Sequence, residues 1–184
     1  STGGPEALKA LFSSLPKNFN IPFVVVQHIL PEFLAGLVKT LNTFSKLEVC
    51  VAEDGQFLEG GKIYFAPGKL QMKVMRKISK GPYIQLTDAA PENKCKPAID
   101  YLFRSVAQVY GKKAMGVALT GMGSDGAKGL KEMKDRGAHT IAQDQASSVV
   151  FGIPHAAIEA GGVVEVLPLR EIAGELKARF LKGI

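Results

Sequence analysis

Three residues with the side chains of a hydrolytic triad lie beside separate predicted elements. Ser1 comes just before a predicted helix, His28 follows an apolar stretch at 21–27, and Asp125 lies in the loop 118–126. A serine hydroxyl attacks an acyl carbon effectively only when a base accepts its proton, and an acid then orients and stabilises the imidazole. These residue types therefore predict acyl-transfer chemistry, provided that the fold brings them together.

The loop that carries Asp125 also permits a second interpretation. Gly121, Gly123 and Gly126 match the Gly-x-Gly-x-x-Gly pattern of dinucleotide-binding loops, and Asp144 lies near the end of the next predicted strand. In that motif a helix N-terminus binds the pyrophosphate, so the carboxylate of Asp125 would compete for the same place. We therefore favour a tight turn whose backbone N–H groups at 121–123 face an oxyanion.

Three alternatives to this hypothesis stay open from the residues alone. In the first alternative, the glycines bind phosphate and the chain is a nucleotide-binding module. In the second, Asp125 serves only as the N-terminal cap of the helix that follows the turn. The third alternative is a non-catalytic interaction domain that keeps the fold.

The remaining histidines and the cysteines do not predict a metal site. We expect His139 and His155 to be structural, because no metal-ligand spacing such as HExxH occurs. Cys50 and Cys95 are isolated, without a CxxC pair. They indicate a reducing compartment, here the cytoplasm, with neither a disulfide framework nor a cysteine-based metal site.

The elements that must position these residues follow from apolar periodicity. We expect helices at 5–15, 32–44, 97–110, 124–136, 154–160 and 169–181, and strands at 21–27, 48–52, 62–66, 115–119, 139–142 and 163–166, with a hairpin over 70–87. This alternation predicts an α/β fold with a doubly wound, mostly parallel sheet, a small antiparallel hairpin and helices on both faces. Sites in such sheets form at the carboxyl ends of strands, where His28 and Asp125 are expected.

Composition narrows the classes of partner. The chain has 184 residues, 46% of them hydrophobic, and a formal net charge of +6. These values suit one domain over 1–184 with a substantial core. The lysines are scattered rather than clustered, so we predict no nucleic-acid binding. No apolar run approaches the roughly 18 residues of a membrane span, so we predict no membrane insertion.

Short motifs spread over almost the whole chain point to a known family. They are Ser1–Gly4, Gln27–His28, Ala52–Gly55, Tyr64–Gly68, Phe103–Ala107, Leu119–Gly126, Ala142–Gly152 and Gly161–Val163. In this order they resemble the catalytic domain of the chemotaxis protein-glutamate methylesterases, the CheB family.

The resemblance implies a serine hydrolase that removes methyl groups from glutamate γ-methyl esters on the cytoplasmic domains of chemoreceptors. It implies that related enzymes also deamidate receptor glutamines. By the matching motifs, Ser1 is the nucleophile, His28 the general base and Asp125 the orienting acid. The backbone N–H of Met122 helps to form the oxyanion hole, and Thr2 borders the site. The resemblance implies no metal and no organic cofactor.

The chain also departs from the family pattern. Family members usually carry an upstream receiver domain, and a strand that typically ends in Ile-Gly-Ala precedes the serine. We therefore expect that residues upstream of Ser1 were omitted or removed. Near the site, this chain has Gln71 in place of a histidine, Cys95-Lys96-Pro97-Ala98 in place of His-Arg-Pro-Ser, and Leu34-Ala35 where an arginine often occurs. We expect these changes to affect the substrate more than the chemistry.

Overall fold

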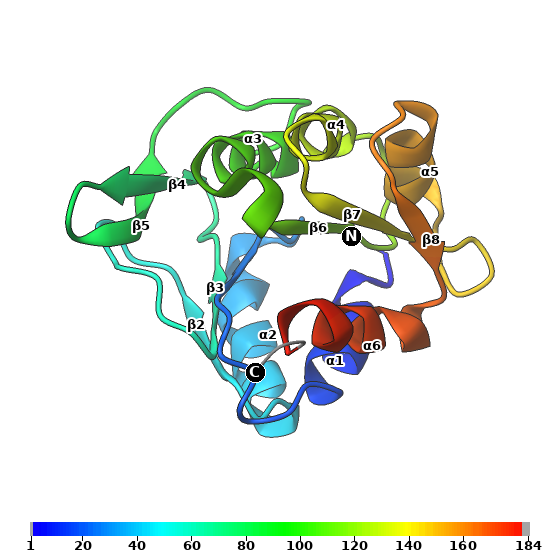
Figure 1. Cartoon of the computed structure of the whole chain (residues 1–184), viewed down its shortest axis with the longest axis horizontal. Helices are drawn as coiled ribbons and strands as arrows, with labels where there is room; N and C mark the ends of the chain where they lie inside the picture. Colours follow the sequence, from blue (N-terminus) through cyan, green and yellow to red (C-terminus); the bar gives the residue numbers. More distant parts are fainter. Residues whose placement is uncertain (1, 182–184) are drawn as a thin grey trace.

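Parallel strands occupy the middle of the molecule, and helices cover both of their faces (Figure 1). The structure is a computed structural model that describes residues 2–181. The predicted nucleophile, Ser1, lies outside the described residues. The predicted α/β class, with mostly parallel strands, a small antiparallel hairpin and helices on both faces, is confirmed.

Among residues 2–181 the parallel strands form two three-stranded sheets rather than one continuous sheet. The first has the order β1-β3-β2, from Phe23–Val25, Lys62–Phe65 and Glu48–Val51. The second has the order β6-β7-β8, from Met115–Ala118, His139–Gln143 and Glu165–Leu167. Parallel neighbours need crossover connections, which helices supply in the second sheet, whereas the non-helical residues 52–61 join β2 to β3. The carboxyl ends of the strands in each sheet therefore share one edge.

The helices divide between the two faces. One face is covered by α1 (Gly4–Ser13), α2 (Pro31–Phe44) and α6 (Leu169–Phe180), and the other by α3 (Ile99–Tyr110), α4 (Ala127–Asp135) and α5 (Gly152–Glu159). A short 3₁₀ turn, η1 (Gly111–Lys113), follows α3. Each face has its own apolar core, with Phe12 and Leu41 in the first and Leu102 and Leu130 in the second. Among residues 2–181, no helix is long and apolar enough to cross a membrane.

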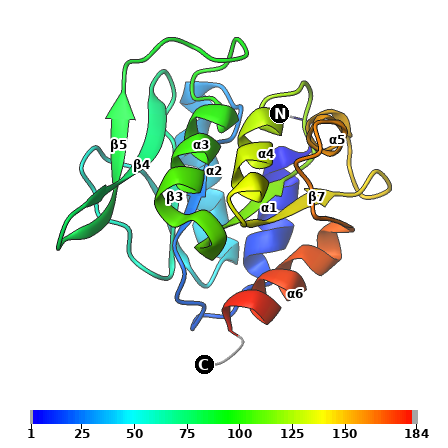
Figure 2. The same cartoon turned by 45° about the horizontal axis from the view of Figure 1, so that its top comes forward.

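The antiparallel hairpin extends the second core. It consists of β4 (Gln71–Lys77) and β5 (Gly81–Thr87), and β4 packs against α3 (Figure 2). Val74 and Ile84 are buried there, and the backbone N–H of Val74 donates to Oγ of Ser105 at 2.9 Å. This contact ties the hairpin to the helix whose N-terminus borders the candidate site.

The strand predicted at 21–27 differs from expectation. A strand as apolar as residues 21–27 is expected to be buried on both faces, but β1 covers only Phe23–Val25 and all three residues are half-buried. A cavity of about 320 Å³ explains this, because it runs between β1 and β6 and is lined by apolar residues of both strands. Within the described residues β1 pairs only with β3, and β6 pairs only with β7. The two strand edges that border the cavity therefore lack a strand partner.

Candidate active site

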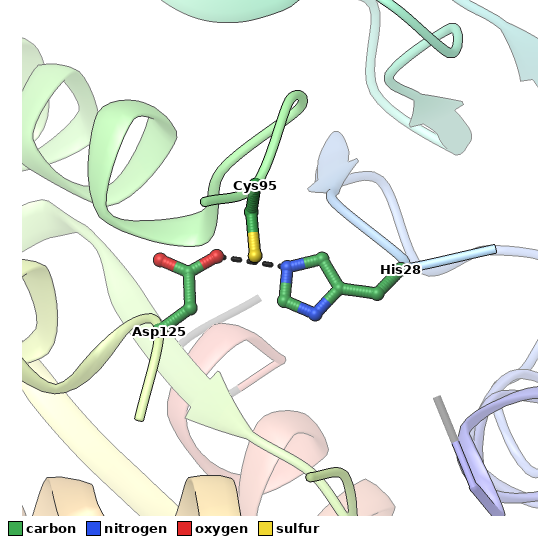
Figure 3. A group of neighbouring side chains, drawn as sticks. All are labelled: His28, Cys95 and Asp125. Atoms are coloured by element: carbon green, nitrogen blue, oxygen red, sulfur yellow. Dashed lines mark hydrogen bonds and ion pairs between the residues drawn. The ribbon is translucent and has the colours of Figure 1, made fainter. Parts of the chain in front are cut away.

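Two of the predicted triad residues meet at the carboxyl ends of β1 and β6. Nε2 of His28 lies 2.8 Å from Oδ2 of Asp125 (Figure 3). The His28 side chain is 21% exposed and that of Asp125 is 3% exposed, so the imidazole reaches solvent while the carboxylate is enclosed. The pair is separated by 97 residues in the chain. Each side chain follows the carboxyl end of a parallel strand, β1 in the first sheet and β6 in the second, and these two ends lie beside the cavity that separates the strands.

Asp125 is held by four donors. Besides Nε2 of His28, Oδ2 accepts the N–H of Ile99 at 2.7 Å, while Oδ1 accepts the N–H of Asp100 at 3.1 Å and Nδ2 of Asn93 at 2.9 Å. The N–H groups of Ile99 and Asp100 belong to the first turn of α3, so Asp125 acts as a cap for that helix. The sequence alternative placed a cap on the following helix, α4. There Gly126 is the N-cap residue, with φ of 98°.

These contacts determine the pKa of the Asp125 carboxyl group and therefore whether it is ionised. Burial alone raises the pKa of Asp125, but the hydrogen bonds from His28, the two backbone N–H groups and Asn93 outweigh it and bring the pKa below its ordinary value. Asp125 is therefore ionised at neutral pH. An ionised carboxylate only accepts hydrogen bonds, so Nε2 of His28 carries the proton between them.

Asn93 links Asp125 to a second buried carboxylate. Its amide nitrogen donates to Oδ1 of Asp125 at 2.9 Å and to Oδ2 of Asp100 at 2.8 Å. Asp100, 3% exposed, also accepts the N–H of Gly129 at 2.7 Å. The amide group of Asn93 thus donates a hydrogen bond to each of two enclosed acidic side chains.

Thr120 positions the loop between β6 and Asp125. Its N–H donates to Oε1 of buried Gln143 at 2.8 Å, and its hydroxyl lies within 3.2 Å of the carbonyl oxygen of Thr2. The hydroxyl also accepts the N–H of Val150 at 3.0 Å. Thr2, predicted to border the site, therefore lies at the carboxyl end of β6.

The N–H groups of the glycine loop do not all face an oxyanion. The N–H of Gly121 donates to the carbonyl of Val150 at 3.0 Å, which removes it from the set predicted at 121–123. Met122, the residue predicted from the family motif, exposes 69% of its surface beside this turn. The oxyanion role of its N–H stays a prediction.

The start of α1 can lie close to the loop that follows β6 only because residue 3 is a glycine. Gly3 is the N-cap residue of α1, with φ of 79°. A Cβ there would lie 2.7 Å from Cγ2 of Val149 and 3.1 Å from Cγ2 of Thr120. A side chain at position 3 would therefore push the start of the chain away from the loop.

The residues that depart from the family pattern lie in different parts of the structure. Buried Gln71 donates to the carbonyls of Ala90 and Cys95 and accepts the N–H of Ala98, so it fixes the loop before α3. The side chain of Cys95 lies beside His28 and Asp125 (Figure 3). Lys96 pairs with the exposed Asp88 at 2.6 Å. On α2, Leu34 is buried in the first core and Ala35 is exposed.

The other two histidines lie away from this pair. His139 begins β7, at the opposite end of the second sheet, where Nε2 lies 2.9 Å from Oε2 of Glu165. His155 lies on α5, and Nε2 is 3.5 Å from Oε1 of Glu159.

The fold and this geometry define a class before any comparison is made. An imidazole held against a buried, ionised acid at the carboxyl ends of strands in an α/β protein is an arrangement from which hydrolases build a base and its orienting acid. The family model for CheB methylesterase matches residues 1–176. The chain therefore belongs to the CheB methylesterase family.

Individual relatives agree with this assignment. The chain is 48% identical over 183 residues to protein-glutamate methylesterase/protein-glutamine glutaminase 2 of Saccharophagus degradans, covering 99% of this chain and 52% of that protein. It is 44% identical over 177 residues to the corresponding protein of Desulfotalea psychrophila, covering 96% of this chain and 49% of the relative. The chain thus spans about half the length of these curated relatives.

A solved structure supports the fold. The crystal structure of the Thermotoga maritima CheB methylesterase catalytic domain superimposes with a TM-score of 0.92 at 39% identity, covering 95% of this chain and 92% of that one.

Proposed function

We propose that this chain is a methylesterase catalytic domain that hydrolyses glutamate γ-methyl esters on the cytoplasmic domains of chemoreceptors, with release of methanol. The observation that carries the proposal is the 2.8 Å contact between His28 and the buried carboxylate of Asp125. The family and the names of the relatives support the substrate. The glutaminase half of those names supports deamidation of receptor glutamines at the same site. Such receptors place the activity in the cytoplasm.

The proton on Nε2 decides how His28 acts in this proposal. In a neutral imidazole the other nitrogen, Nδ1, is then the base. As Oγ of Ser1 attacks the ester carbonyl, its proton passes to Nδ1, and Asp125 stabilises the imidazolium. That proton is then given to the departing methoxide, which leaves as methanol. Water repeats the sequence on the acyl-enzyme and restores Ser1.

The negative charge that develops on the carbonyl oxygen needs donors. We assign this role to the backbone N–H of Met122, with Thr2 bordering the bound ester. The contact between Thr120 and the Thr2 carbonyl supports this placement, because it holds the start of the chain against the loop that carries Met122.

We also propose that one further parallel strand occupies the cavity between β1 and β6. The support is the shape and chemistry of the cavity, which runs from His28 and Thr120 at one end to Tyr110 and Phe180 at the other. Its apolar lining suits a strand buried on both faces. Such a strand joins the two sheets in the order β2-β3-β1-new-β6-β7-β8. The predicted receiver domain upstream of it belongs to the same proposal.

Methanol release from a methylated receptor tests the proposed activity. We expect Ser1→Ala to lower the rate by about 10³-fold or more, since members of a triad act as a unit. Ser13→Ala, an exposed serine at the end of α1, is the matched control and should keep the rate. Unchanged release by Ser1→Ala would exclude Ser1 as the nucleophile.

A further inference from the structure

The thiol of Cys95 lies against the contact between His28 and Asp125. Sγ of Cys95, a ring nitrogen of His28 and a carboxylate oxygen of Asp125 all lie within 4.8 Å of one another. Figure 3 shows the thiol pointing from the loop before α3 toward the line between Nε2 and Oδ2. The three side chains come from three separate segments, so chain spacing could not reveal the cluster.

This set of atoms matches the ligands of zinc. Thiolate, imidazole and carboxylate are the protein ligands of Zn²⁺, at about 2.0–2.3 Å from the metal. Ligand atoms at such distances around a tetrahedral ion lie roughly 3–4 Å apart. The three atoms here lie within 4.8 Å of one another, and Nε2 of His28 and Oδ2 of Asp125, now 2.8 Å apart, would separate slightly to admit the ion.

We propose that Zn²⁺ binds reversibly to Cys95, His28 and Asp125 and thereby inhibits the enzyme. The inhibition, though not the binding, rests on the proposed hydrolytic function. Thiolate ligation favours zinc and similarly soft divalent ions over Mg²⁺ and Ca²⁺.

The expected mechanism of inhibition follows from proton positions. Zinc takes the lone pair of Nε2, so the single proton of the neutral imidazole moves from Nε2 to Nδ1. Nδ1 then cannot accept the proton of Ser1, and the base is lost. The thiol of Cys95 gives one proton to solvent as the Zn–S bond forms. Asp125 exchanges its bond to His28 for a bond to the metal and keeps the N–H donors of α3.

Zinc inhibition of methanol release gives the first test. Measured against its own zinc-free turnover, Cys95→Ser should require about 10–100-fold more zinc, or more still, for half-inhibition than wild type does. Cys50→Ser, which removes the other cysteine, half-buried in β2, is the matched control and should leave that concentration unchanged. Equal zinc sensitivity in Cys95→Ser and wild type would overturn the proposal.

Cobalt substitution gives a test that does not need turnover. Co²⁺ bound to thiolate shows a charge-transfer absorption band, which we expect in wild type, Ser1→Ala and Cys50→Ser and not in Cys95→Ser. A second cluster, His139, Glu165 and Glu175, also meets the distances for a metal but has no sulfur, so it cannot produce this band. A band that persists in Cys95→Ser would contradict the site. A band that depends on Cys95 in a protein without esterase activity would refute the proposed function and leave the metal site standing.

Discussion

Asp125 combines two functions in one carboxylate. Oδ2 accepts hydrogen bonds from His28 and from the N–H of Ile99, while Oδ1 accepts from Asp100 and Asn93. The same charge therefore orients the proposed base and caps α3. Because helix and imidazole share this acceptor, the position of the proposed base is tied to α3, which packs against α4 and β4 in the second core. The side chain at 93 matters for the same reason, since it donates to Asp125 and Asp100 together.

Replacing Asn93 should change the charge of Asp125. In Asn93→Ala both buried carboxylates lose a donor, so we expect the pKa of Asp125 to rise toward its ordinary value. We also expect the free energy of unfolding to fall by about 1–3 kcal/mol, because two buried acceptors lose a partner. Carboxyl titration followed by NMR and urea unfolding measure these two effects.

Asn42→Ala is the matched control for this change. Asn42 makes a similar pair of hydrogen bonds, to the N–H and carbonyl of Val49, on the other face of the molecule. It should lower stability without moving the pKa of Asp125. An Asp125 pKa that is equal in Asn93→Ala and Asn42→Ala would show that Asn93 does not tune the acid.

The contact between Asp125 and α3 makes the stability of that helix depend on pH. The pKa of Asp125 is lower in the folded chain than its ordinary value. Its contribution is therefore fully present above an unfolded pKa of about 3.9 and is lost as the pH falls through the folded pKa. Asparagine, which is neutral at every pH, mimics the protonated acid.

We expect wild type to be more stable than Asp125→Asn at neutral pH by about 1–3 kcal/mol, and this difference to shrink below about pH 4. Urea unfolding at several pH values measures it. Asp135→Asn, on the exposed end of α4, should show a small difference throughout, since surface ion pairs such as Lys131–Asp135 contribute little. A difference that is constant from neutral to acid pH would rule out the ionised cap.

The close packing of α3 against α4 depends on a glycine, Gly129, which has no side chain to separate the helices. A Cβ at Gly129 would lie 2.6 Å from Cβ of Phe103 and 3.1 Å from Oδ1 of Asp100. We expect Gly129→Ala to lower the free energy of unfolding by about 1–3 kcal/mol, because the helices must separate. Gly36, on α2, has nothing within 4 Å of such a Cβ. Gly36→Ala should instead raise stability by about 0.5–1 kcal/mol. Thermal unfolding of both variants measures these two changes in stability. A Gly129→Ala protein as stable as Gly36→Ala would show that the α3–α4 packing does not need glycine at position 129.

Across the whole molecule, local sequence patterns predicted the positions of helices and strands better than they predicted what surrounds each element. The periodicity of 97–110 and of 169–181 led to helices at Ile99–Tyr110 and Leu169–Phe180, because these stretches bury one apolar side. The helix predicted at 124–136 begins later, at Ala127, because Ser124–Gly126 form the turn that presents Asp125.

The site was predictable only where a side chain follows a strand. His28 and Asp125 could be chosen because strand ends are visible in the sequence. Asn93 lies 32 residues from Asp125 in a loop without periodicity, and Cys95 lies in the same loop. Their positions follow from tertiary contacts such as those of Gln71 with the carbonyls of Ala90 and Cys95. No local pattern in the sequence encodes them.

The cavity between the two sheets yields a prediction about the proposed additional strand. If one strand fills it, the backbone N–H groups of β1 and β6 that face it become hydrogen-bonded and exchange slowly. We expect stronger protection at these strands in a chain extended by a segment that supplies the proposed strand than in residues 1–184 alone. Amide hydrogen exchange measures this, with β2, on the far edge of the first sheet, as the internal control. Equal exchange at β1 and β6 in the two proteins would argue against the strand.

The most direct measurement is methanol release by Ser1→Ala, His28→Ala and the double variant. If Ser1 and His28 act as one unit with Asp125, each single change lowers the rate by about 10³-fold or more, and the double change lowers it little further. If the two residues acted independently, the losses would multiply. Multiplied losses, or a single variant with an unchanged rate, would contradict a triad built on the contact between His28 and Asp125.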